Sequence, residues 1–415
     1  IQRTRTLMKI CKKNIIKEME ADMKKILFVL GSMRIGGSVT SLINLLELLQ
    51  KKGYKIDLFL MEHDGLFLER SKNIATLLEE DFILSCVVGD KRKILRQKNL
   101  EKIVVLCFYA LLRIVFGSQK ARNIIFRWRA KKLSCKYDII VAYQEGWITD
   151  FTKYINAQKK IAWIHTQFDK FACNYKHDEL QRIYDYYDNI VCVCNSAKND
   201  ILNVLTNIEN KMFVIQNVLN IENIINKSKE TQFGNLDSSF TLVSVGHFSE
   251  WKQFGRAVAV SKRLVEEGYE FRWFIVGDGT LFNNIQAEIK SADLSEIVVL
   301  LGAMSNPYPI IKNADFLVIT SSYEAHPMVA IEAFVLDTPV ISTSFASAHE
   351  VIQHEVDGLI CENSTDGLYG AIRHVLENKQ LRDKLKYGVL NHSFSNDLML
   401  NQLEQLFGLG EGIHG

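Results

Sequence analysis

The sequence ADFLVITSSYEAHPMVAIE, residues 314–332, joins a strand pattern directly to the start of a helix. Its first half is a nearly continuous apolar run, typical of a buried strand in a parallel sheet. Proline suits a first helical turn, so we predict a helix from Pro327 to about Leu336. We expect the N–H groups of Met328 and Val329 to be unpaired and to face outward, with the positive end of the helix dipole behind them. The segment therefore predicts an anion-binding site at a strand end.

Two glutamates flank this helix start, eight residues apart. Glu324 is expected in the loop before the helix, and Glu332 about one and a half turns further on. One carboxylate could then meet a sugar and the other a ribose, with phosphates held between them. The alternative is that Glu324 is an ordinary loop carboxylate and Glu332 a solvated helix position. The spacing alone does not decide between these readings.

The strand–helix alternation continues along both halves of the chain. Expected strands are 25–30, 54–61, 82–88, 137–143, 160–165, 190–194 and 212–216, then 241–245, 271–276, 297–301, 316–320 and 339–342. Such alternation predicts α/β architecture, with parallel sheets covered on both faces. The length of 415 residues suits two domains of roughly 200 residues each.

We place the domain boundaries where the alternation stops. Residues 23–219 are the predicted N-terminal domain and residues 239–395 the C-terminal domain, joined by a polar linker at 220–238. Residues 1–22 are basic and stand before the first strong strand, so we expect an N-terminal extension of the fold. They lack the uninterrupted apolar core of a secretion signal, so export is not expected. Residues 396–415 form a last helix and a tail.

The motifs around the two glutamates resemble family-4 retaining glycosyltransferases, of the type that builds bacterial polysaccharides. The resemblance rests on Glu324-x7-Glu332, Asn306-Pro307-Tyr308-Pro309 and Ala314-Asp315, and it extends from about Lys24 to Phe407. It implies the GT-B fold, in which two Rossmann-like domains with parallel sheets face a central cleft and the C-terminal helix crosses back to the first domain. The first domain would take the acceptor and the second the donor. The resemblance also implies that Glu324 lies beside the transferred sugar and that Glu332 binds the donor ribose.

The segment VGHFSEWK, residues 245–252, follows the first strand of the second half. The resemblance implies that cations at positions 247 and 252 contact the donor diphosphate and stabilise the leaving group. Lys252 matches the family. His247 replaces the usual arginine, which exchanges a permanent cation for a group that titrates near ~6.5. The alternative is that this segment is simply the start of a helix.

The first strand of the first half is followed by GSMRIGGS, residues 31–38. Gly36 and Gly37 would let the backbone approach a ligand at a helix start. The pattern is not G-x-G-x-x-G, and no acidic residue follows the second strand at the usual ribose-binding place, so a dinucleotide site is disfavoured. The resemblance implies that this turn faces the donor phosphates. A plain tight turn is the alternative.

Two further first-domain residues follow strands. His165 lies at a strand's carboxyl end, where open α/β sheets bind ligands. The resemblance places it beside the donor sugar, where it would be catalytic, and a structural histidine is the alternative. Glu145 follows another strand and could face the acceptor.

Three other second-domain positions are of interest. The turn Val276-Gly277-Asp278-Gly279 resembles one in the family, and its acidic residue most simply caps a helix. Met304 ends a loop that the resemblance places near the nucleotide base. Ala325 and His326 depart from the commoner Gly-Phe, which we expect to tune donor choice without abolishing binding.

Charge is unevenly distributed. From Lys91 to Lys136 there are 14 Lys/Arg and one acid, Glu101, giving +13, so the rest must carry 2 − 13 = −11. Within this block, residues 103–116 are apolar apart from Arg113, too short a run to span a bilayer. We expect peripheral contact of 91–136 with an anionic membrane, each cation contributing about 1 kcal/mol. A core helix with a solvated flank is the alternative, and no motif supports nucleic-acid binding.

No metal or cofactor is expected. The eight cysteines are scattered, the ten histidines lack metal-ligand spacing, and there is no D-x-D triplet. The scattered cysteines suit a reducing compartment. Together with the expected membrane contact of 91–136, we expect a cytoplasmic location at the inner face of the plasma membrane.

The resemblance implies a retaining, metal-independent glycosyltransferase that moves a sugar from a nucleoside diphosphate, with UDP as the default, to a growing, lipid-linked glycan in surface polysaccharide synthesis. Two alternatives remain. One is a synthase or phosphorylase of the same fold that uses another phosphorylated sugar. The other is a catalytically degenerate glycan-binding protein.

Overall fold

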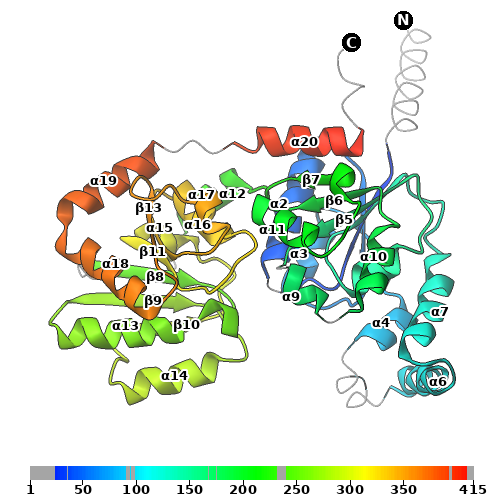
Figure 1. The fold of residues 1–415 in the computed structure, drawn as a ribbon, viewed down its shortest axis with the longest axis horizontal. Coiled ribbons are helices and arrows are strands. Elements are labelled where there is room, and N and C mark those ends of the chain that lie inside the picture. The colour runs from blue at the N-terminus through cyan, green and yellow to red at the C-terminus, as the bar shows by residue number, and fades with distance from the viewer. Residues whose placement is uncertain are drawn as a thin grey trace, which may run out of the picture.

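The computed structural model describes residues 24–34, 36–89, 94, 99–166, 168–173, 175–230, 240–391 and 395–408 (Figure 1). The predicted extension 1–22 lies outside these residues, as do most of the basic run 91–98, the second half of the predicted linker and the tail after Gly408. Two α/β units lie side by side, each built around a parallel sheet. The predicted fold class is therefore confirmed.

The first sheet has seven parallel strands in the order β3-β2-β1-β4-β5-β6-β7. Strand order reverses between β1 and β4, which makes their carboxyl ends the switch point where open α/β sheets bind ligands. All of β1 is buried, as expected for a strand covered on both faces. The strands are β1 (Ile26–Leu30), β2 (Ile56–Leu60), β3 (Thr76–Leu77), β4 (Ile139–Ala142), β5 (Lys159–Ile164), β6 (Asn189–Cys192) and β7 (Met212–Val214).

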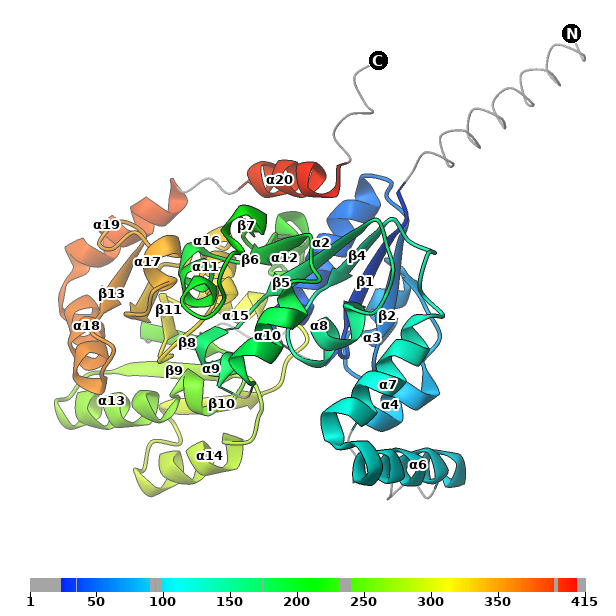
Figure 2. The same cartoon turned by 45° about the vertical axis from the view of Figure 1, so that its right-hand side comes forward.

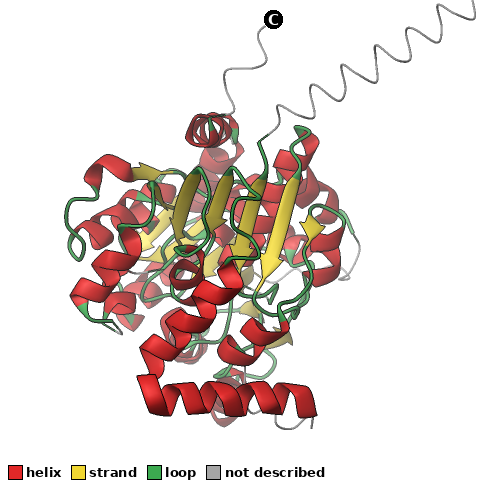
Figure 3. Cartoon of the chain, turned by 90° about the vertical axis from the view of Figure 1, so that its right-hand side faces the viewer, coloured by secondary structure: helices red, strands yellow, loops and turns green. Residues whose placement is uncertain are grey.

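Helices cover both faces of this sheet (Figure 3). The long helix α6 lies at the outer edge of the domain, beside α7 (Figure 2). The helices are α2 (Gly37–Lys51), α3 (Leu68–Lys72), α4 (Phe82–Val88), α6 (Leu100–Phe116), α7 (Ser118–Ala130), α8 (Trp147–Thr152), α9 (Phe168–Ala172), α10 (His177–Tyr184) and α11 (Asn195–Leu202), with a 3₁₀ turn η1 (Glu209–Lys211).

The strand predicted at 82–88 is wrong, because this segment is helix α4. Asp81 caps the helix, accepting hydrogen bonds from the backbone N–H groups of Ile83 and Leu84 at 3.1 Å. The same carboxylate pairs with Arg129 of α7 at 2.5 Å, and both side chains are about nine-tenths buried. The cap and this tertiary ion pair outweigh the strand preference of a β-branched run.

The second sheet has six parallel strands in the order β10-β9-β8-β11-β12-β13, with its switch point between β8 and β11. Neither β13 nor β3 of the first sheet was predicted from the sequence. The strands are β8 (Phe240–Val245), β9 (Phe271–Val276), β10 (Val298–Gly302), β11 (Phe316–Ile319), β12 (Val340–Thr343) and β13 (Gly358–Cys361). The helices are η2 (Glu250–Lys252), α13 (Gly255–Glu266), α14 (Phe282–Ser291), α15 (Tyr308–Asn313), α16 (Met328–Val335), α17 (Ala348–Val351), α18 (Thr365–Glu377) and α19 (Lys379–Leu390).

Two more helices connect the domains. Helix α12 (Ile221–Lys227) falls within the predicted linker and packs on α15 and α16 of the second domain. Helix α19 still belongs to the second domain, whereas helix α20 (Asp397–Phe407) lies over the first domain in both views (Figures 1 and 2). Its Leu400, Leu403, Leu406 and Phe407 join the first-domain core. The predicted crossing back of the C-terminal helix is thus confirmed.

Candidate functional site

The predicted site residues lie at the carboxyl edges of the two sheets. Gly36, Glu145 and His165 follow β1, β4 and β5 of the first domain. In the second domain, the loops after β8, β10 and β11 carry the remaining residues: His247, Lys252, Met304 and Glu324. Loops of the two domains touch at Ala325, whose carbonyl oxygen lies 2.8 Å from the Cys194 thiol. The structure therefore brings these residues to the boundary between the domains.

Glu324 and Lys252 form an ion pair, with Lys252 Nζ 2.8 Å from Glu324 Oε1. Ser321 donates to the same carboxylate oxygen at 2.7 Å, and Ser347 donates to the Glu324 carbonyl at 2.6 Å. The lysine stem lies against Gly246, where an added Cβ would be 3.1 Å from the lysine Cε. Glycine at that position thus leaves room for the lysine to reach the carboxylate.

Arg256 and Asn363 form a brace that supports the loop carrying Glu324 by hydrogen bonds. Arg256 donates to the Thr320 carbonyl at 3.1 Å and to the Asn363 side chain at 2.7 Å. Asn363 then donates to the carbonyls of Ser322 and Ser344 at 3.0 and 2.8 Å. This brace was not predicted from the sequence, because Arg256 and Asn363 are 107 residues apart and belong to no local motif.

The helix start after Glu324 differs in one respect from its prediction. Helix α16 begins at Met328, but the Met328 N–H donates to the His326 carbonyl at 2.8 Å, so it is not unpaired as predicted. Pro327, with φ −76° and ψ 75°, is the central residue of a three-residue turn that satisfies this group locally. The Met328 and Val329 side chains are buried in the second-domain core.

Glu332 lies on α16 and is buried, with only 7% of its surface exposed. Tyr308 donates to its carboxylate at 3.3 Å, a partner that the sequence analysis quoted only as part of a motif. Burial raises the pKa of Glu332 to about 7, and the Tyr308 hydrogen bond opposes this shift. The alternative that Glu332 is a solvated helix position is therefore wrong. A buried carboxylate with one hydrogen bond retains acceptor capacity for a ligand hydroxyl.

The two glycines at the start of α2 border open space. An added Cβ on Gly36 or Gly37 would meet no atom within 4 Å. The packing therefore does not explain glycine there, whereas close approach of a ligand to the backbone would. Gln144 fixes the turn by accepting from the Gly31 N–H at 3.2 Å and donating to Ser38 at 2.8 Å.

The glycines of the turn after β9 have the opposite explanation. Gly277 has φ +147°, and an added Cβ would lie 1.9 Å from the Gly246 carbonyl oxygen. Gly279 has φ +158°, and an added Cβ would lie 2.7 Å from the Phe248 backbone and 2.8 Å from Cε1 of the exposed His247 ring. The prediction that Asp278 caps a helix is wrong, since its carboxylate accepts from the next N–H at 2.7 Å and α14 begins at Phe282. This turn supports the loop that carries His247 by backbone contact.

His165 directly follows β5, and its backbone N–H donates to the Glu145 carboxylate. The Thr166 N–H donates to the same oxygen at 2.8 Å. Burial raises the pKa of Glu145 to about 7, and these N–H groups oppose the shift. Burial, and then the nearby His326, lower the pKa of His165 to about 3, so its ring is neutral at physiological pH. Glu145, predicted near an acceptor, thus fixes the backbone that carries His165.

A second contact between the domains lies at Glu350 of α17. Its carboxylate accepts from the backbone N–H groups of Asn195 and Ser196 at 2.8 and 2.9 Å, at the start of first-domain helix α11. Burial tends to raise the pKa of Glu350, but these N–H donors dominate and lower it. We call this the Glu350 clasp. It was missed from the sequence because it joins residues about 155 positions apart.

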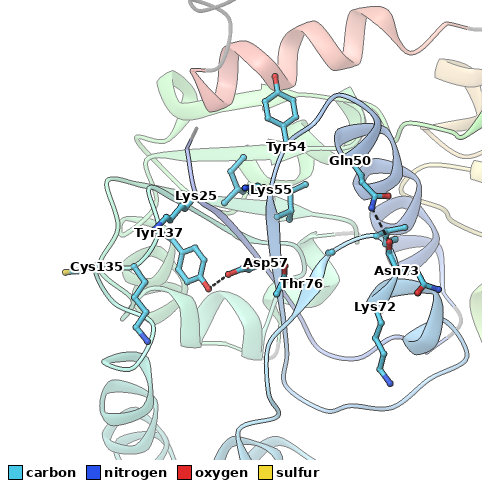
Figure 4. A pocket seen from close by; sticks show the side chains of 15 residues that line it. Lys25, Gln50, Tyr54, Lys55, Asp57, Lys72, Asn73, Thr76, Cys135 and Tyr137 are labelled. Carbon is cyan, nitrogen blue, oxygen red and sulfur yellow. Dashed lines mark hydrogen bonds between the residues drawn. The ribbon is translucent and has the colours of Figure 1, made fainter. Parts of the chain in front are cut away.

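A hollow of about 880 Å³ lies at the amino ends of β1 and β2, away from these residues (Figure 4). Its side chains satisfy one another: Tyr137 donates to Asp57 at 2.7 Å, and Gln50 donates to the Asn73 carbonyl at 3.1 Å. Open α/β sheets bind ligands at the other strand ends. We therefore place the site at the carboxyl ends despite the size of this hollow.

Among the residues that the structure describes, no three His, Cys, Asp or Glu side chains gather as a metal site. Lys252 is a cation of the site, paired with Glu324, and His247 is exposed on the same loop. Met304 is partly buried near the end of β10, packed on the core that holds α16.

Both halves of the chain match known families. Residues 35–223 match Glycosyltransferase Family 4, and residues 226–391 match Glycosyl transferases group 1. A glycosyltransferase of Methanocaldococcus jannaschii is 28% identical over 227 residues, which cover 54% of this chain and 52% of that protein. The N-acetylgalactosamine-N,N'-diacetylbacillosaminyl-diphospho-undecaprenol 4-alpha-N-acetylgalactosaminyltransferase of Campylobacter jejuni is 29% identical over 178 residues, 42% of this chain and 47% of that one. These alignments span about half the length of each relative.

The solved structures extend the likeness to nearly the whole chain. Anabaena HepE in complex with UDP and glucose superposes with a TM-score of 0.70 at 14% identity, covering 93% of this chain and all of that one. At this identity the likeness concerns the fold. The fold, the paired family matches and the Glu324–Lys252 arrangement agree, and the chain belongs to the family-4 glycosyltransferases with the GT-B fold.

Proposed function

We propose that the protein is a retaining, metal-independent glycosyltransferase that transfers a hexose-type sugar from a UDP-sugar to a lipid-linked glycan in surface polysaccharide synthesis. The observation that carries the proposal is the Lys252–Glu324 pair, held 2.8 Å apart on the second-domain loops after β8 and β11, with Glu332 buried eight residues further on. HepE was solved with UDP and glucose, and the C. jejuni relative is named for a diphospho-undecaprenol acceptor. These two names support the choice of donor and acceptor.

The reaction would break the bond between the anomeric carbon and the diphosphate, with the electron pair leaving on phosphate. The acceptor hydroxyl oxygen would bond to the same carbon from the same face, and its proton would pass to the departing phosphate oxygen. Lys252 would neutralise the charge that develops on the phosphate, a role often filled by an Arg, Lys or metal clamp. Glu324 orients the sugar and holds Lys252 in place, and Glu332 accepts from the ribose hydroxyls.

The proposal is tested by measuring UDP release from a panel of UDP-α-sugars, with and without a polyprenyl-diphosphate glycan acceptor. Lys252→Ala should lower kcat by about 10²–10³-fold, as for loss of one transition-state donor. Lys262→Ala, an exposed lysine on α13, is the matched control and should keep wild-type turnover. Normal turnover in Lys252→Ala would remove the assigned role of that lysine.

Two further measurements address stereochemistry and metal dependence. The product's anomeric configuration, read by NMR, should be α when the donor is α, and a β product would contradict retention. Turnover should be unchanged by EDTA, because Lys252 supplies the neutralising charge. Loss of activity with EDTA and recovery with a divalent cation would overturn the metal-independent mechanism.

Peripheral membrane contact through α6 is part of the proposal. Five apolar side chains recur every three or four residues on one face of this helix and are 56–76% exposed: Leu100, Val104, Phe108, Leu111 and Val115. Among the described residues of α6, Tyr109 alone is buried. Such an apolar stripe beside the exposed lysines 120, 131 and 132 suits a helix lying in the surface of an anionic bilayer.

The location would be cytoplasmic, at the inner face of the plasma membrane, where lipid-linked acceptors and nucleotide sugars meet. Among the helices of the described residues, none combines the length and apolarity needed to cross a membrane.

Vesicle co-sedimentation tests this contact. Phe108→Ser with Leu111→Ser removes two exposed side chains, each worth about 1.5–3 kcal/mol when buried in lipid. Binding to vesicles with anionic lipid should fall by about 100-fold, while thermal stability stays unchanged. Leu390→Ser, 58% exposed on α19 of the second domain, is the control and should bind as wild type does. Equal binding by the double variant would remove α6 from the interface.

A further inference from the structure

His326 is the residue that replaces the family's usual apolar side chain between Glu324 and α16. Its imidazole is buried, with 7% of the residue exposed, and lies at the boundary between the domains. Among the described atoms, its Nε2 is buried and has no hydrogen-bond partner. A buried polar atom left unpaired costs about 1–3 kcal/mol, so this one requires an explanation.

A directed chain of hydrogen bonds from the first domain reaches the other ring nitrogen. Ser41 donates to Asn217 Oδ1 at 2.6 Å, which uses the serine's single proton. Tyr143, 2.8 Å from the serine oxygen, must therefore be a donor to it. With its oxygen occupied by Ser41, Asn217 turns its Nδ2 towards His326 Nδ1, at 3.5 Å.

This chain fixes the tautomer of His326. An amide nitrogen can only donate, so His326 Nδ1 is the acceptor. A neutral imidazole that accepts at Nδ1 carries its proton at Nε2. Burial lowers the pKa of His326 to about 4, with Glu350 opposing, so the neutral form prevails at physiological pH. The unpaired Nε2 is therefore an N–H donor directed at no protein acceptor.

A second unpaired imidazole comes from the first domain. Among the described atoms, His165 Nε2 is also buried without a partner, and the nearby His326 contributes to the lowered pKa of His165. Glu145 fixes the backbone at His165. The imidazole of His165 packs on the Tyr143 ring, with centroids 4.7 Å apart. The two rings are thus held in place, one on each side of the domain boundary. His326 is two residues from Glu324 in the sequence.

We propose that His326 is a specificity-determining residue for the transferred sugar, its Nε2–H donating to an oxygen substituent of that sugar alongside His165. The phenylalanine common at this position cannot donate, so the replacement selects sugars that carry a hydroxyl or N-acyl oxygen there over their deoxy counterparts. A site that hydrogen-bonds a substrate group rejects analogues that lack it, because its own buried group is then left unpaired. This inference rests on the proposed transferase function and specifies its donor.

The test compares wild type with His326→Phe and His326→Gln, using UDP, UDP-glucose, UDP-galactose, UDP-N-acetylglucosamine and a UDP-deoxyhexose. Calorimetric binding and kcat/KM for donor hydrolysis are measured for each. In His326→Phe, kcat/KM for the preferred sugar should fall about 10–100-fold and discrimination against the deoxy sugar should shrink equally. His326→Gln, whose side chain still donates a hydrogen bond, should retain part of the discrimination against the deoxy sugar. Affinity for UDP alone should change less than twofold.

Three outcomes would overturn the inference. The first is unchanged discrimination in His326→Phe. The second is an equal loss of UDP and UDP-sugar affinity, which would mean a structural role in joining the domains. The third is a glutamine variant no better than phenylalanine at equal thermal stability. If the wild-type protein binds UDP-sugars no more tightly than UDP and hydrolyses none, the proposed transferase function fails instead, independently of the variants.

Discussion

Replacing Glu332 with glutamine should stabilise the free protein while weakening its nucleotide binding. The carboxylate is buried, and its pKa is raised from 4.5 to about 7 by burial. Each pKa unit corresponds to about 1.36 kcal/mol, so keeping Glu332 ionised above pH 7 costs at most about 3 kcal/mol of folding free energy. Glutamine has nearly the same shape, carries no charge and can still accept from Tyr308. The variant should therefore recover most of that cost.

The pH dependence follows from the direction of the shift. Below about pH 4.5 the carboxyl is protonated in both folded and unfolded protein, and Glu332 has no effect on relative stability. Between pH 4.5 and 7 the unfolded chain ionises first, so wild-type stability falls as pH rises, and above 7 the loss is complete. Glu332→Gln should thus gain little at pH 4.5 and about 6–12 °C in Tm at pH 8, from 2–4 °C per kcal/mol.

Thermal melts at several pH values, with and without UDP, measure both effects. A hydrogen bond to a charged acceptor is worth about 1.5–3 kcal/mol and a neutral one about 0.5–1.5, so UDP affinity should fall roughly tenfold at pH 8. Glu266→Gln, exposed on α13, is the control for simple loss of a negative charge. A lower Tm for Glu332→Gln at pH 8, or unchanged UDP affinity, would refute the reasoning.

Three other predictions concern single contacts. Asp81→Ala removes the α4 cap and leaves buried Arg129 unpaired, so chemical denaturation should show a loss of about 3–5 kcal/mol; a loss below 1 kcal/mol would contradict this. Gly277→Ala forces a Cβ to within 1.9 Å of a carbonyl and should lower Tm sharply, whereas Gly37→Ala meets no atom and should keep Tm but weaken UDP binding. Equal melting points for the two glycine variants would refute the contrast. Glu350→Gln should loosen the Glu350 clasp and increase the radius of gyration in X-ray scattering, and an unchanged profile would argue against that role.

The sequence predicted those parts of the structure that depend on short-range pattern. Most strands lie close to where apolar runs were read, because parallel strands buried on both faces are apolar along their length. The strand prediction for residues 82–88 failed because their helical conformation depends on Arg129, which is distant in the sequence. The Met328 N–H was misassigned because a local turn, rather than the helix, satisfies it. The partners of His326 and Glu350 could not be predicted, since each joins two domains and follows no local period.

The Glu350 clasp has a consequence for how the two domains separate. Asn195 is exposed and Ser196 and Glu350 are partly exposed, so both halves of the contact regain water when it breaks. A hydrogen bond exchanged for hydration is worth only about 0.5–1.5 kcal/mol, or up to about 3 when one partner is charged. The clasp therefore supplies only a small part of what joins the domains, beside the Ala325–Cys194 contact, the His326–Asn217 contact and helix α20. Because a carboxylate is involved, added salt should shift this balance towards separation, making the rate of product departure sensitive to ionic strength.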